Sequence, residues 1–225
     1  MRWCQNGNTD ANNKSIHTFS FTVLADSLRF AVGVSACLNL IVSLIDIANY
    51  FQNTMRSLSD LVHMHVPPWC REWFQNRHPK TMLSYKELLV VQLFNACQCG
   101  VDTGMLWNEH VDRVLSILGI HRLMKDLPIC ARVIDGKIVT MLVSTDDCLI
   151  STKSETARSK VVSHLKQYFT LTTKEASDID YLNHRIAQSS SYITLDQTPY
   201  ILSFTTSYLK NINHTSANTP FRTDR

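Results

Sequence analysis

The stretch Lys137-Ile-Val-Thr-Met-Leu-Val-Ser-Thr-Asp-Asp-Cys-Leu-Ile-Ser151 decides the fold, because an apolar run ends in two adjacent carboxylates, Asp146 and Asp147, and a second apolar run leads away from them. Just upstream, the apolar run Ile129–Ile134 is closed by Asp135-Gly136. Asp-Gly between two runs rich in β-branched residues is a strong hairpin signal. The sequence therefore predicts a buried hairpin, a tight turn that carries two carboxylates, and a return strand.

Adjacent anions at the end of a buried strand repel each other, so they need either water or a cation around them. Asp146 and Asp147 therefore fit a solvated turn or a divalent-metal site, and the residues alone favour the solvated turn. A third carboxylate, Asp46, follows the apolar run Leu38–Ile45, which is typical of a strand covered on both faces. The spacing around Asp46 also fits a plain helix N-cap.

Helical and strand-like patterns flank these runs. A helix is expected from Asp26 or Ser27, either of which can cap it, to about Cys37. The other expected elements are, in chain order, strands at Leu61–Val66 and Glu87–Phe94, a helix at Met105–Leu118 ended by Gly119, a helix opened by a Thr152-x-x-Glu155 capping box, a hairpin of Tyr181–Gln188 with Tyr192–Asp196, and a helix at Gln197–Leu209.

The segment Trp69–Lys80 interleaves aromatic and basic residues, a pattern that can contact nucleic acid. The same composition occurs more often in a loop whose aromatic side chains are tucked inward. The sequence alone favours that loop.

Composition sets the broad class of the protein. Of the 225 residues, 44% are hydrophobic and 18% are charged, which suits a globular chain. The net charge of +3 permits nucleic-acid binding but does not argue for it. The seven cysteines lack zinc-finger spacing, so free thiols in a reducing compartment, the cytoplasm or the nucleus, are expected. The uncharged run Phe30–Ile45 is shorter than the roughly 20 residues of a membrane helix, so a buried helix followed by a buried strand is expected, with a membrane segment as the minor alternative.

The segment Val143-Ser-Thr-Asp-Asp-Cys-Leu-Ile150 resembles the YVDDLLI segment of reverse transcriptases of copia-type LTR retrotransposons. The resemblance continues in the same order from about Thr18 to about Pro220. The other pieces that carry it are Thr18-Phe19, Ala25-Asp-Ser-Leu-Arg29, Asp46-Ile-Ala-Asn-Tyr-Phe51, Met64-His-Val-Pro-Pro68, Gly104-Met-Leu-Trp-Asn-Glu-His110, and Ile193-Thr-Leu-Asp-Gln197 with Tyr200.

The resemblance implies an α+β fold, the palm of a right-hand polymerase, in which an antiparallel sheet carries helices on one face. It implies one palm-like domain at residues 18–210 with the fingers largely missing. Residues 1–17 are expected to be a disordered tail and residues 211–225 a second tail.

The resemblance also implies a two-metal site for RNA-directed DNA polymerisation. Asp46 and Asp146 would hold two Mg²⁺ ions about 3.5–4 Å apart, with Asp147 adjacent and less essential. Phe51 would face the sugar of the incoming nucleotide, with Ile47 beside it. The implied partners are an RNA template, a DNA primer and a deoxynucleoside triphosphate, together with other segments of a retrotransposon polyprotein.

Several positions depart from the family pattern. Val101 and Asp102 stand where the family has lysine and glutamine, Met105 replaces an arginine, and Ser144 replaces the tyrosine before the two aspartates. These changes remove groups that would face nucleic acid or nucleotide, so weak or absent polymerase activity is expected. The alternative is a non-catalytic nucleic-acid-binding scaffold or a relic palm.

Overall fold

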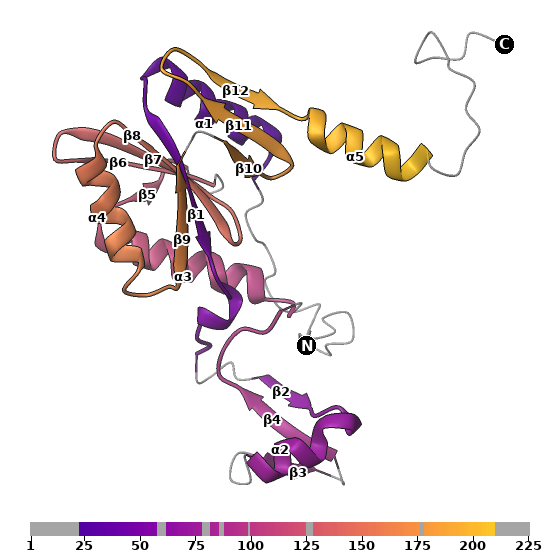
Figure 1. Ribbon diagram of the computed structural model, residues 1–225. Helices are drawn as coiled ribbons and strands as arrows, with labels where there is room; N and C mark the ends of the chain where they lie inside the picture. The colour runs from indigo at the N-terminus through magenta and orange to yellow at the C-terminus, as the bar shows by residue number, and fades with distance from the viewer. Residues whose placement is uncertain are drawn as a thin grey trace.

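A six-stranded antiparallel sheet forms the centre of the chain, with strand order β5-β6-β7-β8-β1-β9 (Figure 1). The computed structural model describes residues 23–57, 62–77, 82–85, 88–98, 100–124, 128–175 and 178–209. In sheet order the strands are β5 His121–Arg122, β6 Ile129–Ile134, β7 Lys137–Val143, β8 Asp147–Thr152, β1 Ile41–Ile47 and β9 Leu171–Glu175. The resemblance begins at Thr18, which lies outside the described residues, as do both expected tails.

Two hairpins predicted from the sequence are confirmed. Asp135 and Gly136 have φ values of 51° and 72°, and positive φ at both central residues is what the tightest hairpin turns require. β7 then turns back into β8, so that Val143 lies across from Cys148. β1 pairs with β8 on its other side, although more than ninety residues separate the two strands in sequence.

Successive side chains of each strand point to opposite faces of the central sheet, and both faces are buried. On one face, Ile45, Met141 and Ile150 pack with helices α3 (Thr103–Ile117) and α4 (Glu155–Leu165). On the other, Leu44 and Leu142 pack with helix α1 (Ala25–Cys37). The α+β fold with an antiparallel sheet and helices is therefore confirmed. Helices cover both faces, however, because α1 lies opposite α3 and α4.

A three-stranded sheet shares the α1 face. Its strands are β10 Ile179–Tyr181, β11 His184–Gln188 and β12 Ile193–Asp196. The prediction of one continuous strand over Tyr181–Gln188 is wrong, because Leu182 and Asn183 have positive φ and form a turn. The Gln188 side chain fastens this sheet to the start of β1, where its Oε1 accepts from the Val42 amide at 2.9 Å.

Residues 62–93, called here the outer unit, form a small body beyond one end of the central sheet (Figure 1). It consists of β2 Val62–His65, the short 3₁₀ helix η4 Pro68–Cys70, α2 Arg71–Arg77, β3 Met82–Tyr85 and β4 Leu88–Leu93. Val66, Cys70 and Val91 form its core. The predicted loop over Trp69–Lys80 is wrong where the structure describes it, because residues 71–77 are helical and both tryptophans are exposed.

Most helix boundaries agree with the sequence prediction, and the caps differ. α3 is followed by Gly119 at a φ of 66°, as expected. α1 ends at Cys37 as predicted, but it begins after Leu24, so Asp26 lies in the first turn and does not cap it. α4 is capped by Ser154, whose Oγ accepts from the Ala157 amide at 3.1 Å, in place of the predicted Thr152 capping box.

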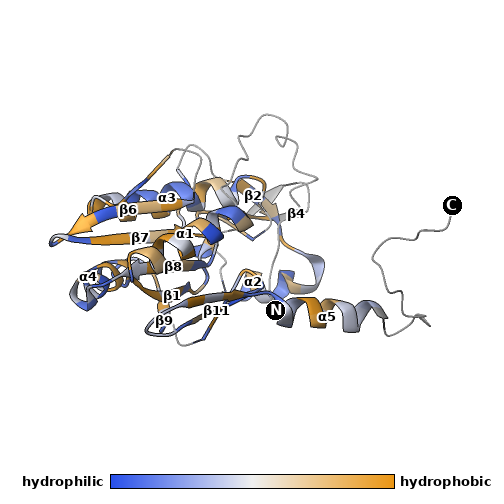
Figure 2. Ribbon diagram, turned by 90° about the horizontal axis from the view of Figure 1, so that it is seen from above, coloured by the Kyte–Doolittle hydropathy of each residue, from blue (hydrophilic) through white to orange (hydrophobic). Residues whose placement is uncertain are grey.

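The final helix, α5, spans Thr198–Leu209 as expected and projects away from the central sheet (Figure 1). Figure 2 shows no strongly hydrophilic stretch along α5. The same figure shows hydrophobic residues along β6 and β7 of the central sheet. Within the described ranges, no helix is long and apolar enough to cross a membrane. The uncharged run Phe30–Ile45 forms the end of α1 and most of β1, which agrees with a buried helix followed by a strand.

Candidate active site

The pairing of β1 with β8 places two of the predicted site residues opposite each other. Asp46 is the register partner of Asp147. Register partners in an antiparallel pair project their side chains to the same face of the sheet. Residues far apart in sequence therefore converge at one end of adjacent strands, as the resemblance implied.

Asp146 lies beside this pair, in the turn between β7 and β8. Its backbone oxygen accepts from the Ile47 amide at 2.8 Å, which ties the turn to the end of β1. Within the turn, the Ser144 amide donates to the Asp147 oxygen at 2.9 Å. Trp107 of α3 is completely buried, and its Nε1 donates to the Ser144 oxygen at 3.5 Å. The two hairpin aspartates thus stand on a turn held by β1 and α3.

The three carboxylates differ in their surroundings. Asp46 and Asp146 are exposed, and each accepts from a threonine hydroxyl: Thr172 donates to Asp46 Oδ2 at 3.3 Å, and Thr145 donates to Asp146 Oδ1 at 3.0 Å. Asp147 is half-buried. Burial, followed by the charges of Asp146 and Asp46, raises the pKa of Asp147 to about 6, against a partial opposing effect from Lys174.

This donor set fits an oxygen-seeking cation. A divalent ion would relieve the repulsion among the three neighbouring carboxylates. Mg²⁺ binds only one or two protein carboxylates and completes its coordination shell with water and phosphate. Among the residues that the structure describes, no three His, Cys, Asp or Glu side chains are close enough together to form a metal cage. The carboxylates therefore suit an ion that arrives with its own phosphate or water ligands.

The two residues expected beside the nucleotide occupy different environments. Ile47 is 1% exposed and packs in the core below α3 and α4, so its side chain faces away from solvent. Phe51 lies in the short 3₁₀ helix η2 (Phe51–Asn53) and is partly buried. The neighbouring Tyr50 packs its ring against Trp107, with centroids 5.5 Å apart. Phe51 thus remains the more accessible of the two nucleotide-side candidates.

Two residues near the carboxylates escaped the sequence analysis. Lys174 of β9 lies close enough to Asp147 to lower the pKa of that carboxyl. Tyr181 of β10 is 1% exposed, and its hydroxyl lies beside the Ser144 side chain of the Asp-Asp turn. Burial raises the pKa of Tyr181 well above its usual range, and the neighbouring Cys148 and Asp147 add to this effect. No sequence signal marked either residue, because both come from strands outside the Asp-Asp hairpin.

Asp102 has a structural role that its motif position did not predict. Its carboxylate accepts two hydrogen bonds from Arg56, at 2.6 and 2.7 Å, and the Arg56 side chain is 1% exposed. The anion is therefore held by a cation of the same chain. His110 of α3 is half-buried and packs against Phe169, and burial followed by Arg113 lowers its pKa.

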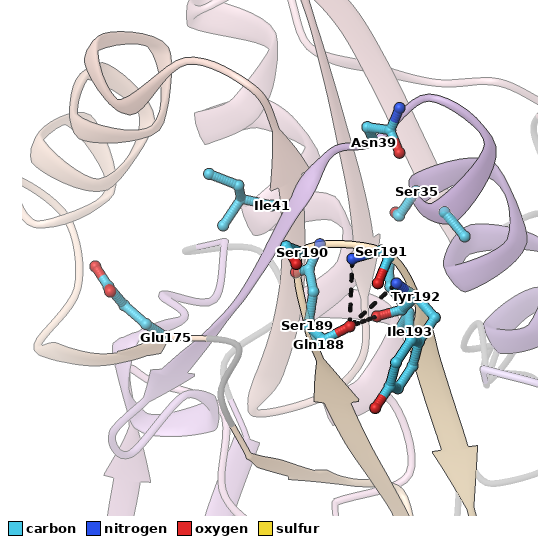
Figure 3. Close-up of a pocket in the computed structure, with 11 residues that line it drawn as sticks. Ser35, Asn39, Ile41, Glu175, Gln188, Ser189, Ser190, Ser191, Tyr192 and Ile193 are labelled. Carbon is cyan, nitrogen blue, oxygen red and sulfur yellow. Dashed lines mark hydrogen bonds between the residues drawn. The ribbon is translucent and has the colours of Figure 1, made fainter.

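A separate hollow lies at the far end of β1. It has a volume of about 410 Å³, and Figure 3 shows it lined by Asn39, Ile41, Glu175 and the serines of the β11–β12 turn. Ile41 begins β1 and Asp46 lies near its end, so this hollow is not part of the carboxylate site. Ser189 Oγ, which accepts from the Ser191 and Tyr192 amides, orders the turn that forms its wall.

No protein-family model matches the sequence, and neither does any curated protein sequence. Among solved structures, the chain is similar to a foamy viral protease–reverse transcriptase in complex with double-stranded DNA, with 15% identity and a TM-score of 0.49 over 95% of this chain and 30% of that chain. The same viral protein in complex with an RNA/DNA hybrid gives 14% identity and a TM-score of 0.40, covering 78% of this chain and 19% of that chain.

A telomerase from Candida albicans in complex with a fragment of telomeric RNA is also similar, with 8% identity and a TM-score of 0.43 over 84% of this chain and 36% of that chain. The chain therefore spans less than half the length of each of these proteins. At TM-scores below 0.5, such likenesses say nothing about the chemistry of the present chain.

Proposed function

We propose that this chain is the palm of an RNA-directed DNA polymerase, a reverse transcriptase of the copia-type LTR retrotransposon kind, and that its activity is weak or lost. The observation that carries the proposal is the register of β1 with β8, which sets Asp46 across from Asp147. The ordered set of sequence motifs from Asp46 to Tyr200 supports the family assignment.

Each carboxylate has a defined part in this proposal. Asp46 and Asp146 would hold Mg²⁺, and Asp147 completes the anionic end of the strands. When bound, two Mg²⁺ ions would lower the pKa of the primer 3′-hydroxyl and neutralise charge on the triphosphate. The chain's own contribution is to position primer, template and deoxynucleoside triphosphate, since positioning and electrostatics dominate phosphoryl transfer. Phe51 would limit the space on the sugar side.

Low activity follows from the residues at the substrate-facing positions. Val101 cannot offer the cation that the family pattern has there, and Asp102 is engaged by Arg56. Ser144 is 8% exposed and presents a small hydroxyl in place of a ring. Substrate would therefore be held by fewer contacts near the reacting atoms.

Primer extension tests the proposal. The full chain is given an RNA template, a labelled DNA primer and deoxynucleoside triphosphates with Mg²⁺ or Mn²⁺, beside Asp46→Asn and Asp146→Asn variants. The matched control is Asp180→Asn, which removes an exposed carboxylate on β10. Slow extension that both site variants abolish and the control retains is the expected result. Extension that survives Asp46→Asn would refute the site.

A non-catalytic nucleic-acid-binding scaffold is the second candidate. It is favoured by the lost substrate contacts at Val101, Asp102 and Ser144. It predicts affinity for nucleic acid that falls steeply with salt and does not respond to Mg²⁺. A folded chain that extends no primer yet binds in this way would establish it, whereas a relic would show neither property.

A further inference from the structure

A stripe of three exposed side chains runs along η4 and α2 of the outer unit. Trp73 and Arg77 are four residues apart in α2, which places them on one face of that helix. Trp69 lies four residues before Trp73, in the 3₁₀ helix η4 that runs directly into α2. Trp69 is 64% exposed and Trp73 is 54% exposed. The guanidinium carbon of Arg77 lies 5.5 Å from the centroid of the Trp73 ring, so the cation and the aromatic ring are stacked.

The outer unit does not use this stripe to build its core. Cys70 of η4 is buried with Val66 and Val91, and Phe74 of α2 packs against that cluster. The Trp73 ring meets Phe74 edge-on, with centroids 5.2 Å apart, yet more than half of each tryptophan is exposed. Large aromatic side chains left together on a surface mark a site of interaction, because burying them elsewhere in the fold would be favourable.

Charge identifies the class of partner. Residues 62–93 contain four lysines and arginines against two glutamates, a net charge of +2 out of +3 for the whole chain. Two histidines of β2, His63 and His65, are also exposed on this unit. Exposed aromatic rings beside cationic groups suit a polyanion with flat apolar faces, and a single-stranded nucleic acid has both. A partner protein with an apolar surface would gain no affinity from this positive charge.

We propose that the Trp69–Trp73–Arg77 stripe is a stacking platform for single-stranded nucleic acid, separate from the carboxylate site. Bases would stack on the tryptophan rings, and Arg77 would supply a charge beside the phosphates. The outer unit lies beyond the end of β1 that carries Asp46, so a strand held on it would extend from that end of the central sheet (Figure 1). The inference rests on the nucleic-acid-binding part of the proposed function and is independent of catalysis.

The test measures the anisotropy of a labelled homopolymeric single-stranded DNA mixed with the full chain at low salt without Mg²⁺. Trp73→Ala is expected to weaken binding by roughly 10-fold, and Trp69→Ala with Trp73→Ala by more. Arg77→Gln is expected to reduce the slope of the logarithm of the binding constant against the logarithm of the salt concentration by about one. The matched control is Tyr208→Ala, which removes an equally exposed ring from the uncharged helix α5 and should leave affinity unchanged.

A fluorescence measurement on a chain that keeps Trp69, Trp73 and Arg77 tests the proposal without variants that could misfold. In a Trp3→Phe background, tryptophan emission comes from the two stripe residues and from Trp107, which is completely buried. Single strands should quench that emission in proportion to binding. Binding without quenching, or binding that both tryptophan substitutions leave intact, would overturn the platform. Primer extension reports separately on the carboxylates: if extension fails while stripe-dependent binding persists, the platform stands and the catalytic proposal falls.

Discussion

Asp147 is a half-buried carboxylate with two other carboxylates beside it. Its pKa is raised from 3.8 to about 6 because burial and two neighbouring carboxylates disfavour the charge. For an acid with a raised folded-state pKa, the folded state holds the proton more tightly than the unfolded state does. The contribution of Asp147 to stability therefore falls as the pH rises from about 4 through about 6.

Asp147→Asn should accordingly stabilise the chain at neutral pH. We expect a gain of roughly 1 kcal/mol, smaller than the full pKa shift implies because the group is only half-buried and solvent screens it. The gain should disappear below about pH 4, where Asp147 is protonated in both states. Urea unfolding at several pH values measures this. A stability difference that does not change with pH would contradict the electrostatic explanation, and Asp180→Asn, at an exposed position of β10, serves as the control.

The sequence predicted the three aspartates but not their full surroundings. Apolar runs that end in Asp46 and in Asp146-Asp147 are local patterns, so their strands were predictable. The resemblance implied that the strands carrying Asp46 and Asp146 are neighbours. The register that pairs Asp46 with Asp147 was not predicted, since no local pattern carries a register between strands so far apart. Lys174 and Tyr181 could not be found, because their proximity depends on where β9 and β10 pack in three dimensions.

At the scale of elements, two glycines should respond in opposite ways to replacement by alanine. Gly136 has a φ of 72° in the β6–β7 turn, and a side chain built there would meet no atom within 4 Å. Gly136→Ala should therefore destabilise through backbone strain alone, by about 1 kcal/mol. Gly33 lies within α1 and is equally open, so Gly33→Ala should stabilise by roughly 0.5–1 kcal/mol. Thermal unfolding of both variants checks the opposite signs, and two shifts in the same direction would contradict this reading of the turn.

Helix starts show why some element boundaries escape prediction. Thr152 and Glu155 have the spacing of a capping box, yet Thr152 belongs to β8 and its hydroxyl accepts from the Ser154 amide. Ser154 sits one residue before the helix and takes the capping role. Both side chains can satisfy helix-start amides, and the length of the preceding strand decided between them.

A two-stranded neck joins the outer unit to the central sheet. The Arg56 amide donates to the Phe94 oxygen and the Ala96 amide to the Thr54 oxygen, both at 2.8 Å. The buried Arg56 guanidinium then clamps Asp102 at the start of α3, and the Asp102 side chain is 14% exposed. This ion pair connects the neck to the helix that supports the Asp-Asp turn.

Removing only one partner of the Arg56–Asp102 ion pair should lower the free energy of unfolding considerably. Arg56→Met leaves Asp102 as a largely buried, uncompensated charge, for which we expect a loss of about 3–5 kcal/mol. Arg56→Met combined with Asp102→Leu should recover most of that loss, because no buried charge remains. Urea unfolding of the two single variants and the double variant forms the cycle. A single-variant loss below about 1 kcal/mol would show that water reaches the pair.

At the scale of the whole molecule, the described part of the predicted domain at residues 18–210 includes a large core in the central sheet and a small core in the outer unit. The core shared by the central sheet, α3 and α4 includes buried side chains from seven helices and strands, among them Trp107, Met141 and Ile150. The outer unit rests on a cluster of three buried residues. Buried apolar surface is the main source of stability, so the small cluster should open more easily than the large one.

Native-state hydrogen exchange should resolve this difference. β4 and β8 are a matched pair, because each is an interior strand bonded on both sides in its own sheet. Amides of β4 should open with a free energy at least about 1–2 kcal/mol below that of β8. Arg56→Met should widen the gap by loosening the neck, and single-stranded DNA should narrow it if the tryptophan stripe is occupied. Equal opening free energies for β4 and β8, with the same dependence on denaturant, would show instead that the outer unit unfolds together with the central sheet.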